Sequence, residues 1–104
     1  MIVRTWVAFA KPGNARAYRE HVRLTVLPQL KKLEGFIGLS VCEAQRDNQV
    51  EILVISRWTS LDAIKAFAGG KVDKAVVDPG ARAVLSEFDD FATHYDVTFE
   101  GVKS

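Results

Sequence analysis

The sequence predicts an α+β domain of two layers, with strands and helices in the order βαββαβ. Three observations support this prediction. Stretches rich in β-branched and aromatic residues alternate with amphipathic helical patterns. Two of these stretches, 36–45 and 50–58, flank a short polar turn and therefore read as a hairpin. The chain has 104 residues, the size of one domain with one core, so we expect 1–104 to be a single domain.

The first strand and the first helix are expected within residues 2–35. β-Branched and aromatic residues dominate 2–10, and the segment KPGN then ends the strand. Apolar residues next recur three or four positions apart, which predicts an amphipathic helix that stops at Gly35. Pro28 lies inside this pattern and predicts a kink or break near Leu27. The apolar stripe consists of Ala15, Tyr18, Val22, Val26, Leu30 and Leu33.

The hairpin turn RDNQ is expected to fix the register of the two central strands. Asp47 and Asn48 tolerate the left-handed conformation that a tight hairpin turn uses. Pairing Arg46 with Gln49 across the turn places Val41 opposite Val54 and Ile37 opposite Trp58. One face then carries Ile37, Leu39, Val41, Ile52, Val54 and Trp58, and the other carries Phe36, Gly38, Ser40, Cys42, Ala44, Leu53 and Ile55.

Neither face of this hairpin is polar, which for an antiparallel sheet indicates that both sides are covered. The helices of a small two-layer domain cover one side only. The second side therefore predicts a partner, most simply an identical subunit whose sheet packs on the face of small residues.

The second half of the chain is expected to form a helix, a short helical segment and a closing strand. Thr59 or Ser60 caps the helix, and Gly69 with Gly70 ends it. Asp78 before a proline marks a second helix start. The helix is expected to bury Leu61, Ile64, Phe67 and Ala68, and the closing strand FDDFATHYDVTFE to place Phe91, Thr93, Tyr95, Val97 and Phe99 on one face. This order is the ferredoxin-like arrangement.

Charge and composition exclude several classes of partner. The net charge is +1, from 14 basic and 13 acidic residues spread along the chain, so nothing attracts a nucleic acid backbone. Cys42 is the only cysteine, which excludes an intramolecular disulfide and fits a reducing cytosol. No apolar run approaches the ~20 residues of a membrane span, so we expect a cytoplasmic protein without a membrane partner. Arg4 and Arg57 are interpreted as salt-bridging residues at a subunit interface.

No motif indicates a cofactor, a metal or a covalent nucleophile. Gly69, Gly70 and Gly80 lie outside the spacing of any phosphate-binding loop. The two histidines, His21 and His94, lack a metal-ligand spacing with carboxylates. We therefore expect no cofactor and no metal.

What remains is a pocket between sheet and helices with a few polar groups. Trp58 ends its strand on the helix side, where its ring supplies an apolar wall and its N–H a donor. Tyr18 and His21 lie three residues apart on one helix and can both face this pocket, with Phe67 from the second helix. His94 is the best general base at neutral pH by residue type. Each also has a purely structural interpretation. Trp58, Tyr18 and Phe67 can be core residues, and His21 a half-exposed residue at the edge of its helix. His94 can be a hydrogen-bonded histidine at the sheet or dimer surface beside Asp96.

A family resemblance adds to this interpretation. The segments VEILVISRWTSLDAIKAFAGG and AVVDPGARAVLSEFDDFATHYDV resemble the antibiotic biosynthesis monooxygenase family. In that family a strand ends in Trp, a Ser- or Thr-capped helix with a buried Phe follows, and a His-Tyr-acidic stretch closes the sheet. The segment LPQLKKLEGFIG also fits, so the resemblance covers nearly the whole chain.

The resemblance implies a dimeric α+β barrel of two ferredoxin-like subunits, each with a pocket. Some members are cofactor-free monooxygenases that oxidise phenolic or anthrone compounds to quinones. Such a reaction needs an apolar pocket, a base and a donor that stabilises the substrate anion. By this resemblance Trp58 is the wall and donor, His94 or His21 the base, Tyr18 a second hydrogen-bonding group, and the partner a small aromatic substrate.

Two other functions remain open. Haem-degrading relatives use an Asn on strand one and a His on the helix after the Trp. Here the first strand reads IVRTWVAFA, without Asn, and no His occurs between Trp58 and His94, so haem is disfavoured. The other alternative is a non-catalytic dimeric module that binds a small apolar ligand. A cavity closed by Phe67, Tyr18 and Leu30 favours the structural interpretation, whereas an open cavity with a histidine at its edge favours an enzyme.

Overall fold

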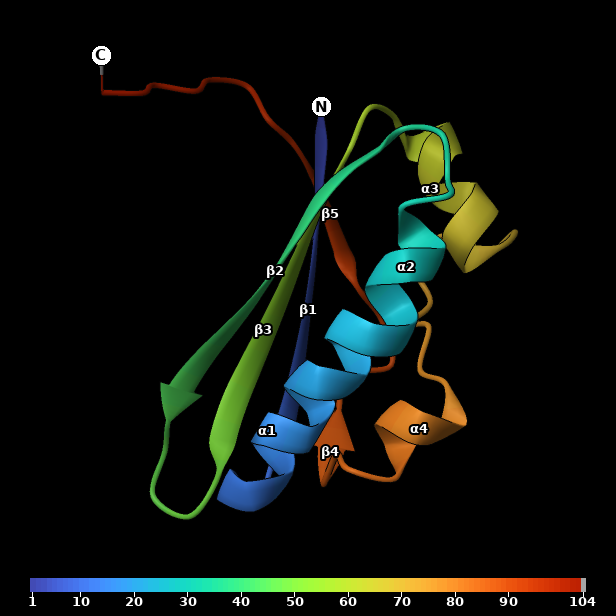
Figure 1. Ribbon diagram of the computed structural model, residues 1–104. Coiled ribbons are helices and arrows are strands. Elements are labelled where there is room, and N and C mark those ends of the chain that lie inside the picture. The colour runs from blue at the N-terminus through green and yellow to red at the C-terminus, as the bar shows by residue number, and fades with distance from the viewer. Residues whose placement is uncertain (104) are drawn as a thin grey trace.

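The computed structural model describes residues 1–103, and the last residue of the expected 1–104 domain lies outside the described residues. All strand pairs are antiparallel, and the strand order is β2-β3-β1-β4 with β5 also beside β1 (Figure 1). The predicted ferredoxin-like α+β fold is confirmed. The strands are β1 (Ile2–Ala10), β2 (Phe36–Gln45), β3 (Val50–Trp58), β4 (Glu87–Phe88) and β5 (Thr93–Asp96), and the helices are α1 (Pro12–His21), η1 (Val22–Val26), α2 (Leu27–Leu30), α3 (Leu61–Ala68) and α4 (Pro79–Arg82).

The irregularity expected near Leu27 is a π-helical turn and not a break. The helical path runs through α1, η1 and α2, and the Leu27 N–H donates to the Val22 carbonyl five residues earlier. Pro28 has no N–H and its ring crowds the preceding turn, so a widened turn just before it relieves the conflict. The long helix therefore keeps its apolar stripe, which includes Tyr18, on the sheet.

The hairpin register is confirmed in its central part, where Val41 pairs with Val54. Two details were wrong. A β-bulge at Ile37 makes Phe36 the partner of Trp58, so Phe36 turns to the helix side and Ile37 is exposed. The bulge adds one residue to β2, which reverses the side of every residue before it.

The second wrong detail is the conformation of the turn. The Arg46 N–H donates to the Gln49 carbonyl at 2.9 Å, so the loop is as short as expected. Among residues 1–103, however, no residue other than glycine has a positive φ. Asp47 and Asn48 thus close the turn without the left-handed conformation that their residue types allow.

The second half departs from the prediction at its end. Ser60 accepts a hydrogen bond from the Ala63 N–H and caps α3, as expected, although Leu61 is exposed. The expected closing strand is divided into β4 and β5, because residues 89–92 leave the ladder, with only an isolated bridge from Phe91 to Lys74. Phe99 lies beyond β5 and is exposed.

The helices cover one face of the sheet, and Figure 1 shows the other face bare. The core lies between sheet and helices in two clusters, one around Tyr18 and Ile52 and one around Trp58 and Ile64. Among the described residues, no helix is long and apolar enough to cross a membrane. The layered arrangement leaves an interior space between the sheet and the long helix, in which a site could form.

Candidate functional site

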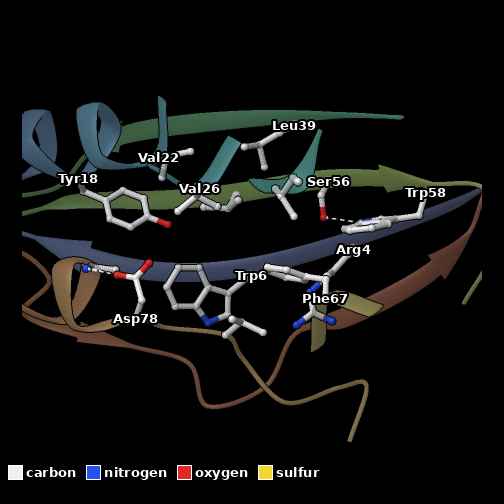
Figure 2. Close-up of a pocket in the computed structure, with 14 residues that line it drawn as sticks. Arg4, Trp6, Tyr18, Val22, Val26, Leu39, Ser56, Trp58, Phe67 and Asp78 are labelled. Carbon is white, nitrogen blue, oxygen red and sulfur yellow. Dashed lines mark hydrogen bonds between the residues drawn. The ribbon is translucent and has the colours of Figure 1, made fainter. Parts of the chain in front are cut away.

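A cavity of about 70 Å³ lies between the sheet and the helices. Apolar side chains from β2, β3 and the long helix form most of its wall, and Figure 2 shows polar groups toward its two ends. Tyr18 and Asp78 lie at one end, and Arg4, Ser56 and Trp58 lie at the other. The cavity is therefore an apolar slot with an acidic end and a basic end.

Trp58 is completely buried and forms the wall of the basic end. Its ring stacks with Phe67 at a centroid distance of 5.9 Å and meets the edge of Phe36 at 5.3 Å. The indole N–H was expected to be available as a donor to a ligand. In the structure it donates to the Ser56 hydroxyl oxygen at 2.9 Å, so the ring serves as wall and its donor is already used.

Arg4 was misinterpreted as an interface residue, because it is 95% buried in this monomer and lines the cavity. Its guanidinium donates to the carbonyl oxygens of Val72 and Lys74 at 2.6 and 3.0 Å. It also donates to His94 Nε2 at 2.8 Å. Burial lowers the pKa of Arg4, while the charge of Asp73 acts in the opposite direction.

His94 is fixed by this contact. A guanidinium can only donate, so Nε2 of His94 must accept and its proton must sit on Nδ1. Nδ1 then donates to Asp73 Oδ1 at 2.9 Å. The three side chains Arg4, His94 and Asp73 form a chain in which only Arg4 reaches the cavity.

At the acidic end, His21 and Asp78 form a pair. His21 Nε2 donates to both carboxylate oxygens, at 2.8 and 3.0 Å, and Asp78 also caps α4 by accepting from the Ala81 N–H. Burial alone would raise the pKa of Asp78. Hydrogen bonds from Ala81, His21 and Gly80 outweigh burial and hold that pKa below its ordinary value.

Gly80 allows this pair to form. A Cβ atom at residue 80 would lie 2.6 Å from His21 Cε1, closer than side chains tolerate. The glycine therefore lets α4 approach α1 until His21 meets Asp78. The sequence did not predict this close approach of α4 to α1. It showed only that Gly80 lies outside the spacing of a phosphate-binding loop.

Tyr18 is the polar group nearest to this pair in the cavity. Burial raises the pKa of its hydroxyl, and the negative charge of Asp78 raises it further. The hydroxyl therefore keeps its proton at neutral pH and acts as a donor. Figure 2 shows it pointing into the slot, with no hydrogen bond to the other residues drawn.

The structure brings some of the predicted site residues together and separates others. Trp58, Tyr18 and Phe67 all line the cavity. The two histidines do not line it: His21 stands behind Asp78, and His94 stands behind Arg4. Sequence reasoning missed Arg4 and Asp78. The sequence did contain an indication for Arg4. It alternates along β1 with Trp6 and Ala8, so its side chain lies on the same face of the strand as these apolar residues.

A second hollow of about 240 Å³ adjoins the cavity. The two share four wall residues, Val26, Leu30, Phe67 and Val76. Phe67 is only partly buried and lies in the last turn of α3, before Gly69 and Gly70. Displacing this wall would join the two spaces and open the slot to larger molecules.

The family model described as antibiotic biosynthesis monooxygenase matches residues 1–79. The chain belongs to this family. The match includes Arg4, Tyr18, Trp58 and Asp78, and it ends before β4 and β5, so His94 lies outside it. A search of curated proteins found no match to the chain. For residues 1–103, no group of three or more His, Cys, Asp or Glu side chains could hold a metal ion.

Solved structures share the fold along the whole chain. A protein of Bacillus cereus described as a putative antibiotic biosynthesis monooxygenase has a TM-score of 0.68 and 24% identity, covering 98% of this chain and 97% of that one. SnoaB of Streptomyces nogalater, described as a cofactor-independent oxygenase, has a TM-score of 0.63 and 16% identity over 95% of each chain. A mutant of MhuD with two manganese protoporphyrin IX molecules bound per active site has a TM-score of 0.63 and 17% identity, covering 99% and 100%. These likenesses establish the fold.

Proposed function

We propose that this member of the antibiotic biosynthesis monooxygenase family oxidises a small aromatic phenol, quinol or anthrone with dioxygen and without a cofactor. The observation that carries the proposal is the slot itself, an apolar cavity with a protonated Tyr18 hydroxyl and a carboxylate–histidine pair at one end. The family membership supports an oxygenase, and the description of SnoaB as cofactor-independent supports the absence of a cofactor.

The proposed chemistry balances without an added reductant. For an anthrone, the CH₂ group becomes a carbonyl while one oxygen atom of O₂ enters the product and the other leaves as water. The substrate supplies all four electrons. The protein has to remove a proton, stabilise the resulting anion and keep water out of the slot.

Particular residues suit these tasks. Asp78, hydrogen-bonded to His21, is the proposed proton acceptor, because its carboxylate is on the cavity wall. Tyr18 is the proposed donor to the developing oxyanion. Trp58 and Phe67 are the proposed walls for the aromatic ring. His94, the base proposed from the sequence, would act on a substrate only through Arg4 in this arrangement.

The homodimer is also part of the proposal. The open face of the sheet carries Val3, Val7, Leu53, Ile55 and Tyr95, which the helices do not cover. A face of this kind in water is typical of an interface. We propose that a second copy packs on it, in the cytoplasm, where the single Cys42 stays reduced.

The alternative is a non-catalytic dimeric module that binds a small apolar ligand, and the mostly apolar wall of the cavity favours it. For either function the wall at Phe67 has to move before an aromatic ring enters, because the cavity is smaller than the engineered cavity of about 150 Å³ that takes benzene. A haem-degrading role has less support, since no His follows Trp58 before His94 and the likeness to MhuD is one of fold.

Oxygen uptake by the purified, metal-free protein tests the proposal. With a panel of anthrones and dihydroxynaphthalenes, we expect protein-dependent uptake that falls at least tenfold in Asp78→Asn and in Tyr18→Phe, since proton transfer contributes about 10²–10⁴-fold. His94→Gln is the comparison that tests the base proposed from the sequence. Uptake equal to buffer for every substrate, with folded protein, would favour the binding module.

A further inference from the structure

We propose that Arg4 makes the basic end of the cavity a binding site for the anionic group of an aromatic ligand, a carboxylate or an oxyanion on the ring. This inference deepens the proposed function and rests on it only in taking the cavity as the substrate site. Nothing in the oxidation itself requires a cation at this end.

The first argument is the burial of the charge. Arg4 is 95% buried, and its guanidinium stays protonated in proteins. A buried charge is costly unless it is paired with an opposite charge. Its partners are two carbonyl oxygens and the neutral Nε2 of His94, none of which carries a full negative charge.

Asp73, the carboxylate linked to Arg4 through His94, does not neutralise the charge of the guanidinium. Asp73 reaches Arg4 only through His94, and its own side chain is 68% exposed, so water screens its charge. The guanidinium has five N–H donors, and three hydrogen bonds are accounted for. Charge and donor capacity therefore remain for an anion in the cavity.

The second argument is the setting of the cation among aromatic rings. The guanidinium carbon lies 5.7 Å from the centroid of the Phe67 ring, which stacks on Trp58. Figure 2 shows Arg4, Phe67 and Trp58 together at one end of the slot, away from Tyr18 and Asp78. A flat ring bearing an anionic group fits such a site, with the ring against the aromatic walls and the anion on the guanidinium.

The two ends together define an orientation. An anion is repelled by Asp78 and attracted by Arg4, so the anionic group faces the basic end. The opposite edge of the ring, with a hydroxyl or an acidic C–H, then faces Tyr18 and Asp78. The ring enters by displacing the shared wall at Phe67, because the cavity alone is smaller than benzene requires.

A purely structural role for Arg4, holding residues 72–74 against the sheet, makes a different prediction. Hydrogen bonds to two carbonyl oxygens would then be its whole task, and ligand charge would be irrelevant. Benzoate and benzamide separate the two roles, since they have nearly the same shape and differ in charge.

The test is calorimetric titration of the full-length wild-type protein with each compound. We expect benzoate to bind at least tenfold more tightly than benzamide, the size of one charge-assisted hydrogen bond. The side-chain N–H signal of Arg4 in a nitrogen–proton correlation spectrum should shift with benzoate only. Equal affinities, failure of both compounds to bind, or an unmoved Arg4 signal would overturn the proposal.

Variants test whether Arg4 causes the preference for benzoate over benzamide. Arg4→Met should bind the two compounds equally, and Arg4→Lys should keep part of the preference, since the charge remains without the planar fork. Arg57→Met is the matched control, because Arg57 lies on the other face of the sheet, near Ser40, and its loss should leave the preference unchanged. A retained preference in folded Arg4→Met would overturn the assignment. If that variant does not fold, Arg4→Lys and the wild-type spectrum decide.

Benzoate has no hydroxyl to oxidise, so binding is measured without turnover. A preference for benzoate without oxygen uptake would remove the proposed oxidation and keep the anion site. Oxygen uptake with equal binding of benzoate and benzamide would keep the proposed oxidation and remove the anion site.

Discussion

The charged groups at the two ends of the cavity, Asp78 and Arg4, are compensated in different ways. At the acidic end, Asp78 receives hydrogen bonds from His21 and from the first turn of α4, so its charge is satisfied within the protein. At the basic end, the hydrogen bonds of Arg4 go to carbonyl oxygens and a neutral imidazole nitrogen, none of which carries a full negative charge. The acidic end is thus complete as folded, whereas the basic end retains an uncompensated charge. The comparison indicates that an end without internal compensation is the better candidate for ligand charge.

The largest expected effect concerns the wall of the basic end. Trp58→Ala removes a completely buried ring and should lower the free energy of unfolding by about 3–5 kcal/mol. Urea unfolding followed by circular dichroism measures this loss. Phe99→Ala is the control, since Phe99 is exposed and should change stability by less than about 0.5 kcal/mol. Equal effects of the two substitutions would contradict the placement of Trp58 in the core.

A smaller effect is expected at the acidic end, from Gly80→Ala. The added Cβ would meet the His21 ring, so His21 must move from Asp78, at a cost of about 1–3 kcal/mol in unfolding free energy. Gly13→Ala is the matched control within α1, where an added Cβ meets no atom within 4 Å. That change should stabilise the helix by about 0.5–1 kcal/mol. If Gly80→Ala, like Gly13→Ala, did not lower the free energy of unfolding, the close contact between α4 and His21 of α1 would be contradicted.

The smallest effect concerns pH and the charge of Asp78. Its pKa is lower folded than unfolded, so ionisation of Asp78 stabilises the protein above the ordinary carboxyl pKa of about 3.9. This stabilisation is lost as the pH falls through the lowered pKa. Asp78→Asn keeps an N-cap acceptor and removes the charge, so it should be slightly less stable than wild type at neutral pH.

Thermal unfolding of both proteins across acidic pH measures this difference. The two melting temperatures should converge as the pH falls below the ordinary carboxyl pKa. The effect should be modest because the Asp78 side chain is 39% exposed. A gap between wild type and Asp78→Asn that stays constant with pH would show that the His21 pair does not stabilise the carboxylate.

Much of the fold and part of the site were predictable from the sequence, for identifiable reasons. Periodicity gave the long helix and the hairpin, because burial of one face requires apolar residues at the spacing of the element. Trp58, Tyr18 and Phe67 were placed at the cavity by the same reasoning. Arg4 was not, since an arginine alternating with apolar residues on a strand usually lies at a surface, and its hydrogen-bond partners come from 68 to 90 residues later in the chain.

The sequence alone determined the element order, the family resemblance and the aromatic wall, because these depend on local patterns of residue type. The tertiary structure decided how charges meet. The β-bulge at Ile37 turned Phe36 onto Trp58, Gly80 let His21 reach Asp78, and the chain from Asp73 through His94 fixed Arg4 at the cavity. Each of these depends on the distance between segments far apart in the chain, and a distance of that kind is set by packing and not by residue spacing.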